Sequence, residues 1–127
     1  MSILKHLKPT ESELEILRIL WDKQKATVRE VHEILSTHKD AGYTTTLKLM
    51  QIMFEKGLVK RDDRNKTHIY FANISKENTQ HQFVGKMIHT LFGGSPTQLV
   101  MQALGNHKHT EEELEEIQKL LNNLKKQ

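Results

Sequence analysis

The sequence of 127 residues contains no cysteine, which excludes disulfides, cysteine catalysis and zinc or copper sites with cysteine ligands. It also lacks an apolar stretch approaching the roughly 20 residues of a membrane-spanning helix. Residues 1–7 show neither the apolar run nor the small-residue cleavage site of a signal peptide. Hydrophobic residues make up 36% of the chain, which is enough for a modest core. We therefore expect a small cytoplasmic protein of one domain, or of one domain with an appendage.

The positive charge of the chain is small and unevenly distributed. The net charge is +3, and residues 1–73 carry 13 basic and 10 acidic residues, whereas residues 74–127 carry 6 of each. Residues 43–68 alone hold 6 basic and 3 acidic residues. A local positive field is the minimum requirement for binding a polyanion, so this part of the chain is where a nucleic-acid contact is to be sought.

Helix starts are well marked in the sequence. A threonine followed three residues later by glutamate, the spacing of a capping box, occurs at Thr10, Thr27 and Thr110. An apolar stripe at helical spacing follows each of them. Thr44 or Thr45 is expected to cap a further helix. The expected inner face of that helix comprises Leu47, Met50, Met53 and Phe54, and its expected end is Gly57.

The pattern between this helix and residue 75 is that of a β-hairpin. Residues 58–61 and 67–71 are short and rich in β-branched and aromatic residues, and a polar turn, residues 62–66, separates them. Asp62 and Asp63 can fix such a turn through bonds from side chain to backbone. Three helices followed by a hairpin is the winged helix-turn-helix arrangement, so we expect a mainly α fold with a small β-hairpin wing.

Helices resume at Ser75, and Ser95-Pro96 is the expected start of the second helix of this part. Their apolar faces are wide and have no sheet to lie on, which favours a second copy of the chain as partner. We therefore expect a winged-helix DNA-binding domain at 1–73 and a helical dimerisation region at 74–127. The expected dimer interface comprises Phe83, Met87, Ile88, Leu91, Phe92, Leu99, Leu104, Leu114, Ile117, Leu121 and Leu124.

In a winged helix the third helix lies in the major groove, and the hairpin reaches the neighbouring backbone. Hydroxyl groups at the start of that helix suit phosphate oxygens, and Lys48 and Gln51, one turn further, suit base edges. The predicted DNA contacts are Tyr43, Thr44, Thr45, Lys48 and Gln51 from the helix, and Arg61, Arg64 and Lys66 from the hairpin. The alternative is a winged helix that binds proteins and has no specific DNA site.

These residues resemble the penicillinase-repressor (BlaI/MecI) family of bacterial transcriptional regulators. The resemblance covers nearly the whole chain and is carried chiefly by residues 9–17, 27–31, 42–47 and 55–61. It implies a homodimer that binds a dyad-symmetric operator in double-stranded DNA and represses by blocking the promoter. It also implies that the predicted contacts on the third helix lie on its DNA-facing side.

The chain departs from this family at two places. Ile52 stands where members often have an arginine, so one DNA contact of the family is missing. Antibiotic-responsive members are cut at an Asn-Phe bond in the helix that corresponds to residues 97–104, where this chain has no Asn-Phe. Val100 and Met101 occupy that position, and proteolytic inactivation by a membrane-bound sensor protease is expected there if it occurs at all.

No pattern in the sequence predicts an enzyme. There is no glycine-rich phosphate loop, zinc-protease motif or nucleophile elbow. His107 and His109 are two ligands in one loop and do not make a metal site. The nearby Glu111, Glu112 and Glu113 are explained as charges in the first turn of a helix, where the helix dipole favours them. We expect no metal, no cofactor and no small-molecule substrate.

Overall fold

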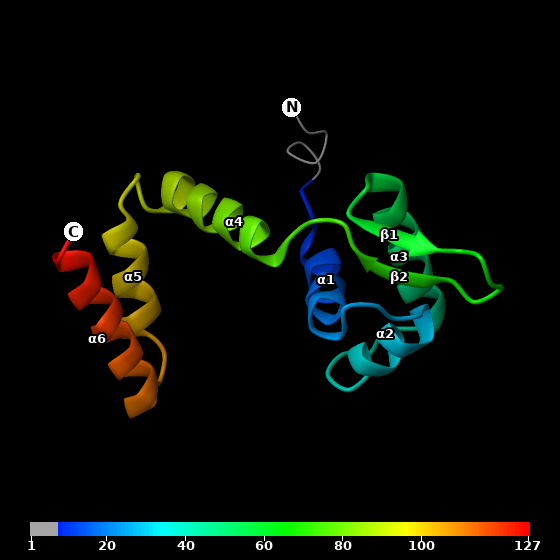
Figure 1. Cartoon of the computed structure of the whole chain (residues 1–127), viewed down its shortest axis with the longest axis horizontal. Coiled ribbons are helices and arrows are strands. Elements are labelled where there is room, and N and C mark those ends of the chain that lie inside the picture. The colour runs from blue at the N-terminus through cyan, green and yellow to red at the C-terminus, as the bar shows by residue number, and fades with distance from the viewer. Residues whose placement is uncertain (1–7) are drawn as a thin grey trace. The chain divides into compact units, whose positions relative to one another are not determined.

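The computed structural model describes residues 8–127 and contains six helices and one hairpin within them (Figure 1). The chain divides into two compact units, the first ending at His81 and the second beginning at Gln82. In chain order the elements are α1 (Glu11–Lys23), α2 (Val28–Leu35), α3 (Tyr43–Lys56), β1 (Val59–Asp62), β2 (Ile69–Ala72), α4 (Lys76–Leu91), α5 (Pro96–Gly105) and α6 (Glu111–Lys125).

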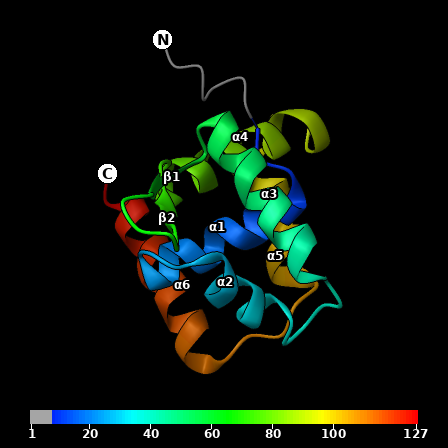
Figure 2. The ribbon, with the colours of Figure 1, turned by 90° about the vertical axis from the view of Figure 1, so that its right-hand side faces the viewer.

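The first unit has one core, to which α1, α2, α3 and the hairpin all contribute. Helices α1, α2 and α3 contact one another, and α1 also contacts β2 (Figure 2). Ile16, Leu17, Val31, Met50 and Met53 are completely buried there. The amphipathic stripes of the sequence predict this core, because each helix turns one apolar face inward.

The capping boxes are confirmed at all three threonines. In each, the threonine hydroxyl accepts a hydrogen bond from the backbone N–H of the glutamate three residues on, and the glutamate side chain accepts one from the threonine N–H. Ser95 caps α5, with Pro96 as first helical residue, and Gly57 ends α3 in the left-handed conformation, both as predicted. These signals act within four residues, so the sequence is enough to place them.

The start and the inner face of α3 differ from the prediction. The helix begins at Tyr43 with Gly42 at the N-cap and without a side-chain cap, so neither Thr44 nor Thr45 caps it. Thr46 is buried, whereas Phe54 is 36% exposed and Leu47 is only half-buried. The inner face is therefore rotated toward Thr46, whose hydroxyl lies 3.3 Å from His32 Nδ1 and donates a weak 3.4 Å hydrogen bond to the Gly42 carbonyl.

The hairpin pairs β1 and β2 antiparallel, with Val59 opposite Ala72 and Asp62 opposite Ile69. A third segment joins it, because Ala26 and Tyr70 exchange two backbone hydrogen bonds of 3.0 and 2.8 Å. This bridge fixes the link between α1 and α2 beside the hairpin. It therefore places the start of α2 next to the wing.

One buried ion pair joins the start of α1 to the end of α3. Glu13 is 2% exposed, and both its carboxylate oxygens accept hydrogen bonds from Lys56 Nζ, at 3.0 and 2.8 Å. Burial acts to raise the pKa of Glu13, but the hydrogen bonds from Lys56 and from the Thr10 N–H outweigh it, so the pKa is lowered. The pair ties the end of α3 to the start of α1.

Replacing Glu13 by glutamine is expected to lower the free energy of unfolding by about 1–2 kcal/mol at pH 7, because the bond to Lys56 loses its charge. The folded pKa of Glu13 lies below its unfolded value, so its contribution is present above that unfolded value and is lost as pH falls through the folded one. The difference from wild type should therefore shrink in acid. Urea unfolding at pH 7 and pH 3 measures it.

Glu15→Gln is the matched control for this prediction. Glu15 forms an ion pair of 2.8 Å with Lys39, but each side chain is 37% exposed. Such a pair contributes at most about 1 kcal/mol. A Glu13→Gln effect that is equal at both pH values would contradict the assignment.

The second unit lacks a core of its own in the single chain. Between Gln82 and Gln127 no residue is buried. Leu91 and Met101 are 73% and 67% exposed, and Leu114, Leu121 and Leu124 are each about half exposed. Apolar faces of this extent are normally covered in a folded protein.

Candidate nucleic-acid interface

An exposed polar stripe runs along α3 opposite its buried side. Tyr43, Thr44, Thr45, Lys48 and Gln51 are all exposed. Thr44, Lys48 and Gln51 lie on the same face, each about one turn from the next, because their spacing is four and three residues. All five helix residues singled out from the sequence therefore lie where a ligand of α3 can reach them.

The first turn of α3 is held by α2. The ring of Tyr43 meets the ring of His32 edge to face, with centroids 5.6 Å apart at 81°. The guanidinium of Arg29 lies 5.4 Å from the centroid of the same tyrosine ring. Contacts of this kind restrict the ring to one orientation. Tyr43 is therefore positioned before any ligand arrives.

Arg61 on β1 connects the wing to the far end of α3. Its guanidinium carbon lies 3.9 Å from the centroid of the Phe54 ring, a cation–π contact. Its Nε is buried and has no hydrogen-bond acceptor among the described residues. The nearest carboxylate oxygen, Asp63 Oδ2, lies 3.9 Å away, which is too far for a hydrogen bond. Phe54 thus supports the Arg61 guanidinium at the edge of the core.

Arg64, at the tip of the wing, is bound within the hairpin. Its Nε and Nη2 donate to the two oxygens of Asp62, at 2.9 and 2.6 Å, and its backbone N–H donates to the same carboxylate at 3.2 Å. The Arg64 side chain lowers the pKa of Asp62 to about 2, so Asp62 is charged at neutral pH. Asp62 thus fixes the turn, as the sequence predicts, and offsets the charge of Arg64.

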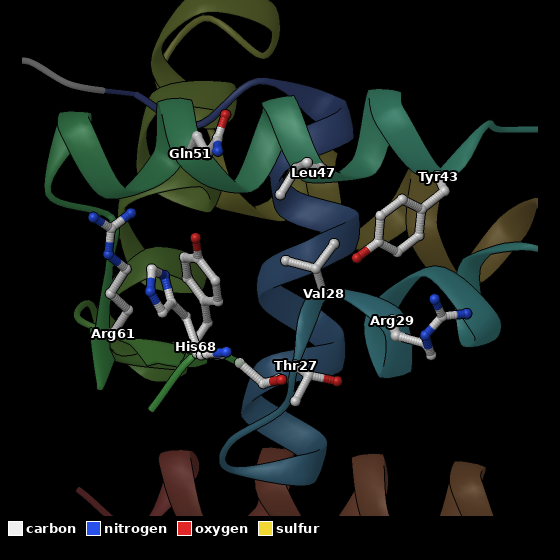
Figure 3. Close-up of a pocket in the computed structure, with 11 residues that line it drawn as sticks. Thr27, Val28, Arg29, Tyr43, Leu47, Gln51, Arg61 and His68 are labelled. Atoms are coloured by element: carbon white, nitrogen blue, oxygen red, sulfur yellow. The ribbon is translucent and has the colours of Figure 1, made fainter. Parts of the chain in front are cut away.

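A pocket of about 650 Å³ lies between α2, α3 and the wing (Figure 3). Three residues at four-residue spacing on α3 line one side, the first turn of α2 lines another, and the hairpin lines a third. We call it the wing pocket. Its lining residues are Thr27, Val28, Arg29, Tyr43, Leu47, Gln51, Arg61, Lys66, Thr67, His68 and Tyr70.

The wing pocket gathers part of the predicted DNA-contact set. Tyr43, Gln51, Arg61 and Lys66 line it, whereas Thr44, Thr45, Lys48 and Arg64 lie outside. It also brings in Arg29 and His68, which the sequence reasoning did not select. Nothing in the spacing of these two residues indicates the site, since it is the bridge between Ala26 and Tyr70 that brings the start of α2 to the wing.

The described histidines do not cluster with other side chains that commonly bind metals. Within residues 8–127, no three His, Asp or Glu side chains come together in a way that could hold an ion. His109 Nε2 instead lies 3.0 Å from the carbonyl oxygen of Leu104 and so braces the turn between α5 and α6. Over the same residues, no helix combines the length and apolar character needed to cross a bilayer.

Three packed helices followed by an antiparallel hairpin, with an exposed polar stripe on the third helix, define a winged-helix protein. The family model described as "Penicillinase repressor" matches residues 9–123. The chain therefore belongs to the penicillinase repressor family, whose members are DNA-binding transcriptional regulators and not enzymes.

The relatives within this family are distant. The chain is 22% identical to the penicillinase repressor of Staphylococcus aureus over 96% of its own length and 97% of that protein's. It is 23% identical to the methicillin resistance regulatory protein MecI of S. aureus strain N315, over 89% and 92% of the two chains. It is 42% identical to the transcriptional regulator BlaI of Mycobacterium tuberculosis H37Rv over 41% and 40% of the two lengths. Among solved structures, the apo form of a mutant of Lactococcus lactis ZitR has a TM-score of 0.43 and 21% identity, covering 98% of this chain and 87% of that one.

Proposed function

We propose that this protein is a cytoplasmic, homodimeric transcriptional repressor that binds a palindromic operator sequence-specifically. The observation that carries the proposal is the exposed stripe of α3, held at one end by α2 and at the other by the wing. A rigid helix face beside a basic hairpin is what insertion into a major groove requires. Repression is steric, because the bound dimer covers the promoter.

The predicted contacts on α3 divide into phosphate contacts and base contacts in this proposal. Thr44 and Thr45 contact phosphate oxygens at the start of α3, where backbone N–H groups and the helix dipole favour an anion. Lys48 donates to guanine, and Gln51 forms a bidentate pair with adenine. Arg64 has the weakest role, because Asp62 already occupies its guanidinium.

The second unit supplies the dimer in this proposal. Apolar residues recur on α6 at the 3-4-3 spacing of Leu114, Ile117, Leu121 and Leu124, a seam that suits pairing of helices. Ile117 is partly buried, and the three leucines are about half exposed. Two copies place two α3 helices on one DNA duplex, with half-sites about one or two helical turns apart. Loss of the dimer would release the operator, since half of the phosphate contacts give far weaker binding at physiological salt.

Regulated proteolysis forms a further part of the proposal. Val100 and Met101 on α5 are 44% and 67% exposed in the single chain. A protease requires an extended substrate, so cleavage between them would need α5 to unwind first. Such cleavage, by a membrane-bound sensor, would cut the dimerisation region and release the DNA.

The test of the proposed function is selection from random duplex DNA with the purified protein near physiological salt. Enrichment of a palindrome with fixed spacing of its half-sites is the expected result. A folded protein that enriches nothing would refute the proposal. It would then favour the protein-binding alternative, with the exposed stripe of α3 as the docking surface.

Replacing Asp62 by asparagine is expected to tighten DNA binding about 2- to 5-fold, because it removes a negative charge from the wing and frees Arg64 for a phosphate. The salt dependence should also steepen by up to about one unit of slope if Arg64 gains one phosphate contact. Titration at several salt concentrations measures both. The double variant Asp62→Asn/Arg64→Gln is the control, and an equal gain in it would show that Arg64 plays no part.

A further inference from the structure

The wing pocket gathers three cationic side chains and one histidine. Arg29, Arg61, Lys66 and His68 line it, and the lining includes no aspartate or glutamate. Among the described residues, Arg29, Lys66 and His68 have no hydrogen bond or ion pair, and the carboxylate nearest to Arg61 is 3.9 Å away. Arg64 differs, because Asp62 holds its guanidinium at 2.6 Å and it stays outside the pocket. A pocket with this lining attracts an anion in preference to a cation or a neutral ligand.

Two of these cations are held in place before an anion arrives. Arg61 stacks on Phe54 and Arg29 lies against Tyr43. Figure 3 shows Arg61 and His68 on the hairpin side of the pocket and Arg29 on the α2 side. An anion between them would meet cations of α2 and of the hairpin. Preorganised cations lose little conformational freedom on binding, which makes such a site stronger than a set of mobile surface lysines.

The position of the pocket indicates which anion it receives. Tyr43 and Gln51 belong both to the exposed stripe of α3 and to the pocket lining, so the pocket opens directly beside the stripe. When α3 lies in a major groove, the phosphate chain bordering that groove runs alongside the helix. On the wing side that chain must pass over the opening of the pocket.

We propose that the wing pocket binds one backbone phosphate of the strand that borders the major groove, with Arg29, Lys66 and His68 as phosphate contacts. The inference rests on the proposed function and adds Arg29 and His68 to its contact set. Tyr43 becomes a positioning residue in this site, because its ring holds Arg29. The same chemistry would suit a free phosphate-bearing molecule, so the test must distinguish the two sources.

The experiment uses the 127-residue chain and the operator obtained by selection. A series of operator duplexes is synthesised, each with a single uncharged methylphosphonate linkage at a different backbone position of one half-site. Wild type should lose about 10-fold in affinity at the position that occupies the pocket. Arg29→Gln and Lys66→Gln should each lose about 10-fold on the unmodified operator, and clearly less on the duplex with that one linkage. When the neutral linkage stands at any other position, the fold-loss from the variant and the fold-loss from the linkage should multiply, because the two changes are independent.

Arg64→Gln is the matched control, because it removes a cation of the same hairpin from outside the pocket. The affinity loss caused by Arg64→Gln should multiply with the loss caused by the neutral linkage at the pocket position, because Arg64 does not contact that phosphate. Arg61 is unsuitable as a variant here, because its removal would also break the stack on Phe54. Losses that multiply at every position for Arg29→Gln and Lys66→Gln would overturn the inference, since these cations would then act only through a general field.

Pyrophosphate, titrated into the free protein by calorimetry, tests the other source. Binding weaker than about 1 mM, together with one coupled linkage, supports a backbone phosphate. Tighter binding that Arg29→Gln abolishes, without any coupled linkage, would assign the pocket to a free phosphate compound and overturn the DNA assignment. Failure to select any operator would refute the proposed function itself, whereas an operator without a coupled position would refute only the role of the pocket.

Discussion

Replacing Leu121 by aspartate is expected to convert the protein to monomers and to weaken operator binding by at least about 100-fold. Leu121 lies in the middle of the α6 seam and is 45% exposed in the single chain. In a paired helix seam, a carboxylate at this position would have to be buried without a counter-charge, which costs several kcal/mol. Sedimentation equilibrium measures the oligomeric state, and titration with operator DNA measures the affinity.

Asn123→Asp is the matched control for this prediction. It adds the same charge to the same helix, on a side turned away from the seam, and should leave both dimer and affinity unchanged. The first unit should remain folded in both variants, because its core lies before residue 82. A stable dimer of the Leu121→Asp variant would show that the interface lies elsewhere in the second unit.

Replacing Lys48 by alanine is expected to weaken binding to the selected operator by about 1–3 kcal/mol, because the donor to a base edge is lost. Lys48 is exposed on the stripe of α3 and takes no part in the core, so the fold should be unaffected. The affinity for random DNA should fall much less. Competition titrations with both DNAs at one salt concentration measure the ratio.

Equal losses on operator and random DNA would show that Lys48 contacts only phosphate. Lys60 offers a control in the same unit, because it is an exposed lysine on β1 that belongs neither to the stripe nor to the wing pocket. Lys60→Ala should leave the ratio of the two affinities unchanged. A fall in that ratio would mean that base reading is not confined to α3.

The sequence determined the features that depend on residues close together in the chain. Each capping box joins residues three apart, and the glycine that ends α3 acts through its own backbone angle. The hairpin follows from two short β-forming runs and a polar turn between them. With the apolar stripes, these local signals suffice for the order of elements, the winged-helix fold and the exposed residues of α3.

The tertiary structure decided everything that depends on contacts between distant segments. The bridge between Ala26 and Tyr70 brings Arg29 to the wing, and Arg61 of the wing stacks on the partly exposed Phe54 ring. Thr46 takes an inner position that the sequence pattern gave to Phe54. Such contacts depend on how helices cross and how the hairpin twists, and side-chain spacing along one chain contains no information about either.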